Sequence, residues 1–124
     1  MPGVRLLPLM KALSIQIQPE RAPDLKMEEV QAAFEAIAEM SSLVRHHQFD
    51  DGFDRTRYFN FTFGTEDLKG LWAMIQSTIY SNPVLAEPMA ISSMAVCTGE
   101  HGWDDYHLLF HFDPDESRVD INAI

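Results

Sequence analysis

The stretch that decides the fold is RYFNFTFG, residues 57–64. Its three Phe residues recur at every second position, whereas Tyr58, Asn60 and Thr62 occupy the positions between them. Strict alternation of this kind predicts a strand that buries one face and exposes the other. The segment LSIQIQ, residues 13–18, alternates in the same way and predicts a second strand with one buried face.

An amphipathic segment lies between these two strands. Apolar residues between positions 30 and 44 fall at helical spacing, which predicts a first helix that begins after Asp24 and ends near His46. His46 and His47 would then lie at the helix C-terminus, where the helix dipole favours an imidazolium. The segment 47–55 is rich in Asp and contains a Gly, which predicts a loop.

The second half of the chain predicts one more helix and two more strands. Thr65 is a candidate N-cap of a second helix, and Pro83 marks its end. The apolar run 89–98 predicts a strand inside the sheet. Residues 99–105 predict a long hairpin loop, and residues 106–113 alternate again and predict the last strand.

These elements follow in the order strand–helix–strand–helix–strand–strand. We expect an α/β (α+β) two-layer sandwich in which both helices cover one face of a four-stranded mixed sheet, with the first three strands parallel and the last antiparallel. The alternative is a ferredoxin-like arrangement, which requires a further strand within residues 4–9 or 49–55. We expect residues 1–9 to be an N-terminal extension and residues 10–124 to be a single domain.

The chain is strongly acidic. Its 124 residues carry a formal net charge of −10, and residues 87–124 hold eight acids against one base, Arg118. Acidity of this size disfavours nonspecific binding to nucleic acid and to anionic membranes. No apolar run reaches the roughly 18–20 residues of a membrane helix, and the one cysteine, Cys97, fits a reducing compartment. We therefore expect a soluble cytoplasmic protein.

Histidine and aspartate near the last strand are the candidates for catalysis. Alternation places His107, Leu109, His111 and Asp113 on one face, and His101 lies in the preceding loop. At about 3.3 Å per residue, His107 and His111 would lie roughly 13 Å apart, too far to bind one zinc ion together. His111 and Asp113 are closer, but a third ligand would have to come from another strand.

No other segment of the sequence matches a known catalytic or metal-binding motif. Asp113 and Asp115 begin like a calcium-binding loop, but Arg118 and Ile124 stand where Gly and Glu are required. Cys97 lies in an apolar run and is expected to be a buried, unreactive thiol. No P-loop, GxSxG, GxGxxG or HExxH motif occurs. We expect no metal and no cofactor.

The loop GEHGWDDY, residues 99–106, is the strongest candidate for recognition, because aromatic side chains carry much of the binding energy of interfaces. The uncovered face of the sheet adds polar and aromatic side chains. The candidate binding residues are Tyr58, Asn60, Glu100, His101, Trp103, Asp104, Asp105 and Tyr106.

Two functions are favoured, and a structural subunit of a larger assembly is a third alternative, which would aggregate when expressed alone. The first is a small acidic binding protein, expected to be a homodimer, that covers a basic protein partner as an inhibitor or immunity-type protein does. The alternative is a small hydrolase or isomerase that uses His107, His111, Asp113 and His101, with or without a metal ion. A structure that shows whether these side chains converge discriminates between the two.

Overall fold

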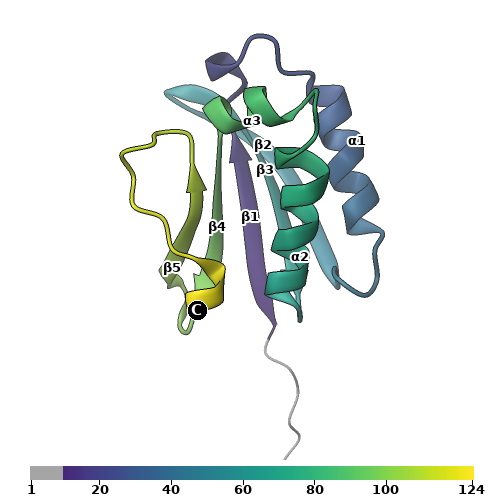
Figure 1. Ribbon diagram of the computed structural model, residues 1–124, viewed down its shortest axis with the longest axis vertical. Coiled ribbons are helices and arrows are strands. Elements are labelled where there is room, and N and C mark those ends of the chain that lie inside the picture. Colours follow the sequence, from purple (N-terminus) through teal and green to yellow (C-terminus); the bar gives the residue numbers. More distant parts are fainter. Residues whose placement is uncertain (1–9) are drawn as a thin grey trace, which may run out of the picture.

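The computed structural model describes residues 10–124 and shows a layer of helices on one face of a sheet (Figure 1). The predicted extension, residues 1–9, lies outside the described residues. The strands are β1 (Lys11–Ile17), β2 (His46–Asp54), β3 (Thr56–Thr65), β4 (Ser93–Gly99) and β5 (Gly102–His111). The α-helices are α1 (Met27–Ala38), α2 (Leu68–Ile75) and α3 (Ala86–Ser92), and the short helical turns are η1 (Pro19–Arg21), η2 (Gln76–Tyr80) and η3 (Ile121–Ala123).

The sheet has five strands in the order β2-β3-β1-β4-β5, and every pairing in it is antiparallel. The α+β class is confirmed, whereas the prediction of four strands, three of them parallel, is wrong. The reason is the extra strand β2, which reverses the chain between α1 and β3. The first four strands and the two crossover helices have the ferredoxin-like order given above as the alternative, and β5 extends the sheet beyond β4.

β2 occupies the segment predicted to be a loop. The first helix ends at Ala38, so His46 and His47 begin a strand and do not terminate a helix. Phe49 anchors this strand, because its ring lies edge-on 4.8 Å from the ring of Phe61. Arg55, with a φ of 65°, makes the tight connection to β3.

The core lies between the sheet and the helices. Phe34 of α1 is fully buried and stacks on Phe61 at 4.4 Å, with the two rings 17° from parallel. Leu13, Ile15 and Ile17 of β1 are also fully buried, as their alternation predicts. Each of these large side chains contributes roughly 1.5–3 kcal/mol by leaving water.

The second helix begins through two successive hydrogen bonds. The Thr65 hydroxyl accepts from the backbone NH of Asp67 at 2.9 Å, and the Asp67 carboxylate accepts from the NH of Gly70 at 2.9 Å. Asp67 is therefore the N-cap, and Thr65, the predicted cap, fixes its position from the end of β3.

The apolar run 89–98 is two elements, which corrects the prediction of a single strand. Its first residues belong to α3, where Met89 is fully buried, and the chain becomes extended at Ser93. A continuous apolar run does not separate a buried helix from a buried strand, because neither element leaves a polar face to set a period.

The predicted hairpin loop is shorter than expected. β4 ends at Gly99, β5 begins at Gly102, and the pairing is irregular between Gly102 and His107. A second irregularity lies at Leu109, because Ala95 pairs with Phe110 while the next residue, Val96, pairs with Leu108. Leu109 is thus an extra residue, a β-bulge, and it is buried in the core.

Candidate functional site

The face of the sheet opposite the helices is uncovered within the described residues, and we call it the open face (Figure 1). It carries polar cross-strand pairs, among them Ser14 with Thr62 and Gln16 with Asn60. No Lys or Arg of the five strands points to this face. Lys11 and Arg57 are the basic residues of these strands, and their positions in the alternation place both on the helix side.

A chain of hydrogen bonds crosses three strands of the open face. The amide of Asn60 donates to Asp50 of β2 at 3.3 Å and accepts from Gln16 of β1 at 3.3 Å. Gln16 in turn accepts from Gln18 at 3.4 Å, and Gln18 accepts from Arg21 at 2.6 Å. These bonds restrict the side chains, so the part of the open face over β1, β2 and β3 presents a largely preorganised polar surface.

A hollow of about 230 Å³ lies at one end of this polar surface. Tyr58, one of the predicted binding residues, stands on its wall opposite Gly52 of β2. A Cβ atom at position 52 would collide with the Tyr58 hydroxyl, so this glycine is what allows the ring to lie across the strand. The lining is entirely polar and consists of Gln16, Gln18, Asp54, Thr56, Tyr58 and Asn60.

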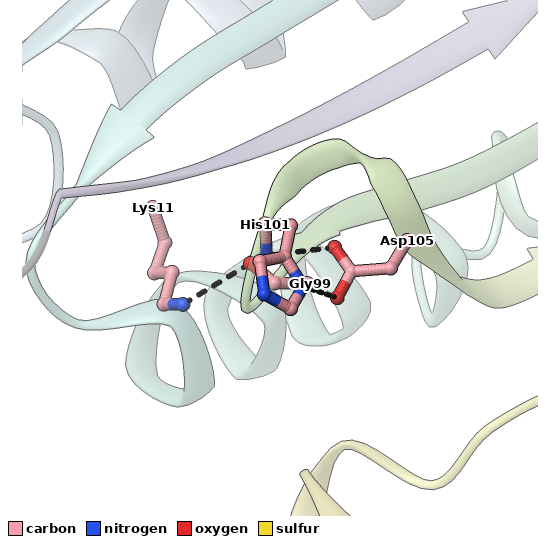
Figure 2. Close-up of polar contacts among 4 residues, drawn as sticks. All are labelled: Lys11, Gly99, His101 and Asp105. Atoms are coloured by element: carbon pink, nitrogen blue, oxygen red, sulfur yellow. Dashed lines mark hydrogen bonds and ion pairs between the residues drawn. The ribbon is translucent and has the colours of Figure 1, made fainter.

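The turn between β4 and β5 is built around Asp105 (Figure 2). Its carboxylate accepts from the backbone NH of His101 at 2.8 Å and lies 3.1 Å from the His101 ring. Desolvation acts to raise the pKa of Asp105, but the two hydrogen bonds with His101 and the charge of its ring together outweigh it and lower the pKa. Lys11 donates to the carbonyl of Gly99 at 3.3 Å and ties the turn to β1.

The predicted recognition residues therefore fall into two groups. Tyr58 and Asn60 lie in the hollow, beside the C-terminal end of β1. Glu100, His101, Trp103, Asp104, Asp105 and Tyr106 lie around the β4–β5 turn, which flanks the N-terminal end of β1. The seven residues of β1 separate the groups by about 20 Å. Trp103 and Tyr106 are 46% and 58% exposed, so neither ring folds into the core.

The bulge at Leu109 separates the predicted catalytic residues. His107 pairs with buried Cys97 and lies on the helix side, whereas His111 pairs with Met94 and lies on the open face. The expectation that both imidazoles share one face is wrong, because the extra residue reverses the alternation.

The other two predicted catalytic residues, Asp113 and His101, do not form a common site with His107 and His111. The ring of His111 accepts from the backbone NH of Asp113 at 2.9 Å, and the Asp113 carboxylate accepts from the NH of Asp115 at 2.9 Å. His101 belongs to the Asp105 turn. Across residues 10–124, no group of three His, Cys, Asp or Glu side chains is arranged to hold a metal ion.

Cys97 is fully buried, and burial raises the pKa of its thiol to about 11 despite the nearby Lys11 charge and a backbone hydrogen bond from His107. A thiol in this state is neutral at physiological pH and is a poor nucleophile.

Sequence reasoning did not find Gln16, Gln18, Asp50 and Asp54 as parts of the site. Gln16 and Gln18 alternate with buried residues of β1 and were visible as the polar side of a strand. Asp50 and Asp54 carried no such signal, because a cluster of Asp residues around a Gly is typical of loops.

No protein-family model matches the chain, and no curated protein matches its sequence significantly. Among solved structures, the chain is similar to a phage SAM lyase in complex with S-methyl-5'-thioadenosine. The TM-score is 0.50 at 14% sequence identity, and the match covers 90% of this chain and 97% of that chain. The likeness shows a shared fold over nearly the whole of both chains.

Proposed function

We propose that this protein binds a cationic partner on the open face of its sheet. The observation that carries the proposal is the charge of that face: no Lys or Arg of the five strands points to it, whereas Asp50 and Asp54 do. A preorganised polar surface with unopposed carboxylates attracts a basic partner and repels an acidic one.

The charge of the whole chain supports the same proposal. The net charge of −10 attracts a basic protein over several ångströms and speeds its association, as an inhibitor or immunity-type protein requires. Seven of the eight acids of the last third lie at the β4–β5 turn and in the segment after β5, where Glu100, Asp104 and Asp115 are exposed, and the eighth, Glu87, lies in α3. These acids extend the negative field beyond the open face.

The test is a titration of the full chain with a blocked lysine homopeptide, followed by amide chemical shifts. We expect shifts at Gln16, Asn60 and Thr62 and an affinity that falls with added salt. A glutamate homopeptide of the same length is the control and is expected not to bind. Shifts confined to the helix side, or equal binding of both peptides, would refute the proposal.

The His/Asp-dependent enzyme is not proposed further, because the bulge separates His107 from His111 and the β4–β5 turn holds His101 elsewhere.

Homodimerisation stays a prediction, for which sedimentation of the purified chain is the direct test. Within residues 10–124, no helix has the length and apolar character to cross a lipid bilayer.

A second candidate function is binding or cleavage of S-adenosylmethionine, the SAM of the similar structure. The likeness in fold over 90% of this chain favours it, and SAM is a sulfonium cation that suits a face whose strands contribute Asp50 and Asp54 but no Lys or Arg. The hollow beside Asp54 and Tyr58 is a candidate place for such a ligand.

The test is incubation of the purified chain with SAM and chromatographic detection of S-methyl-5'-thioadenosine. We expect product formation above the spontaneous rate and its loss in Asp54→Asn, with Glu35→Gln on α1 as the charge-matched control. A thermal-shift measurement with S-methyl-5'-thioadenosine reports binding without turnover. No product and no shift would exclude this candidate.

A further inference from the structure

The two edge strands of the sheet differ, because within the described residues one is covered by another segment of the chain and the other is not. The C-terminal segment covers the edge of β5, because the NH of Val119 donates to the Leu108 carbonyl at 2.8 Å and Arg118 donates to the His111 carbonyl at 2.8 Å (Figure 1). β2 forms the other edge, and within residues 10–124 its backbone pairs with β3 alone. A nine-residue strand therefore keeps one row of backbone donors and acceptors open.

The side chains along β2 define what this edge accepts. On the open face, Asp50 and Asp54 stand four residues apart with Gly52 between them. On the helix side, Phe53 is 74% exposed, and the Asp51 carboxylate lies 3.6 Å from the guanidinium of Arg57. One side of the edge is thus acidic, and the other offers an exposed aromatic ring and a neutralised acid.

A second copy of this chain fits the edge poorly. Antiparallel pairing of β2 with itself about a two-fold axis near its centre places the Asp50–Asp51 pair of one copy opposite the same pair of the other. Like charges directly across a strand pair are destabilising. The central self-pairing of β2 is therefore disfavoured, whereas a basic strand meets no such repulsion.

We propose that the free edge of β2 takes an extended segment of a partner in which Lys or Arg alternates with apolar residues. The basic residues lie on the open face against Asp50 and Asp54, and the apolar residues lie against Phe53. Backbone hydrogen bonds to β2 supply much of the affinity, and the alternating side chains supply the specificity. This inference rests on the proposed function and names the chemistry and the conformation of the partner.

The probe is a short peptide, blocked at both ends, in which Lys and Val alternate. We expect it to slow hydrogen exchange of amides within residues 46–54 of the full chain. The double variant Asp50→Asn/Asp54→Asn is expected to weaken binding about three- to tenfold, from two partly screened charge contacts. The matched control, Glu28→Gln/Glu29→Gln at the start of α1, removes the same charge and is expected to leave the affinity nearly unchanged.

A second peptide, N-methylated at every amide, separates strand pairing from simple attraction between charges. It keeps the lysines but cannot donate along either of its edges, and we expect its binding to fall at least tenfold. Equal binding of the two peptides, with shifts on the open face, would overturn strand addition and leave the proposed function standing. Failure of both peptides and of the lysine homopeptide to bind would overturn both proposals.

Discussion

Removal of the Ser93 hydroxyl destabilises the fold more than removal of the Tyr80 hydroxyl, because the hydrogen bonds between them have a fixed direction. The Ser93 hydroxyl donates to the carbonyl of Met89 at 2.6 Å, so its single proton is used there. Tyr80 lies 2.7 Å away and must therefore donate to the Ser93 oxygen. Burial raises the pKa of Tyr80 well above its usual range, with the Ser93 hydrogen bond opposing the rise.

The magnitudes follow from which groups lose a partner. In Tyr80→Phe, Ser93 keeps its bond to Met89 and only one hydrogen bond is lost, which costs about 0.5–1.5 kcal/mol. In Ser93→Ala, the Met89 carbonyl still accepts from the backbone NH of residue 93. The Tyr80 hydroxyl, however, stays in the interior without an acceptor, which costs about 1–3 kcal/mol.

The double variant Tyr80→Phe/Ser93→Ala has no orphaned hydroxyl. We expect it to be no less stable than Ser93→Ala alone, which gives a coupling energy of about 1 kcal/mol in the double-mutant cycle. The assay is urea unfolding followed by far-ultraviolet circular dichroism. Equal m-values for wild type and variants check that unfolding stays two-state. Additive losses, or a larger loss for Tyr80→Phe than for Ser93→Ala, would refute the assigned direction of the bonds.

Three further predictions concern the core, the turn and the thiol. Phe34→Ala removes the ring that stacks on Phe61 and is expected to cost about 3–5 kcal/mol, measured as a shift of the urea midpoint. Because the folded state lowers the pKa of Asp105, its carboxylate stabilises the fold above the ordinary Asp pKa, and this contribution disappears as the pH falls through the lowered value. Asp105→Asn is therefore expected to be less stable than wild type at pH 7, with a gap in melting temperature that narrows below about pH 4; a constant gap would contradict the assignment. Cys97, with a thiol pKa of about 11 and no exposed surface, is expected to react with a disulfide reagent at pH 8 only at the rate of unfolding, and rapid labelling of the native chain would contradict its burial.

Much of the fold was predictable where one physical signal dominated. The alternation of RYFNFTFG and LSIQIQ predicted β3 and β1, because each strand buries one face against the helices. The stripe that contains Phe34 predicted α1, whose length was overestimated. Val44 is buried although it lies beyond the end of this helix, so burial alone did not require the helix to continue.

The missed features are those where local chemistry and tertiary context disagree. Asp50, Asp51 and Gly52 have the composition of a turn, yet they form a strand because β3 offers a full row of backbone partners and Phe49 packs on the core. The bulge at Leu109 left only a weak signal in the sequence, a single apolar residue at a position that the alternation of residues 106–113 assigns to the polar face.

The sequence predicted individual residues of the candidate site but not which strands bring them together. Tyr58 and Asn60 were correctly placed on the exposed side of β3, and the structure adds Asp50 and Asp54 beside them from a strand that sequence reasoning did not see. The β4–β5 turn lies near the other end of β1, because antiparallel pairing carries the end of β4 away from the hollow.

The bulge in β5 also supplies a pair of native reporters. Because one extra residue lies between them, the imidazoles of His107 and His111 sample opposite surfaces of the same strand. A ligand that covers the β4–β5 part of the open face is expected to perturb the ring resonances of His111 more than those of His107. The unmodified protein thus carries its own spectroscopic means of telling on which face of β5 a partner lies.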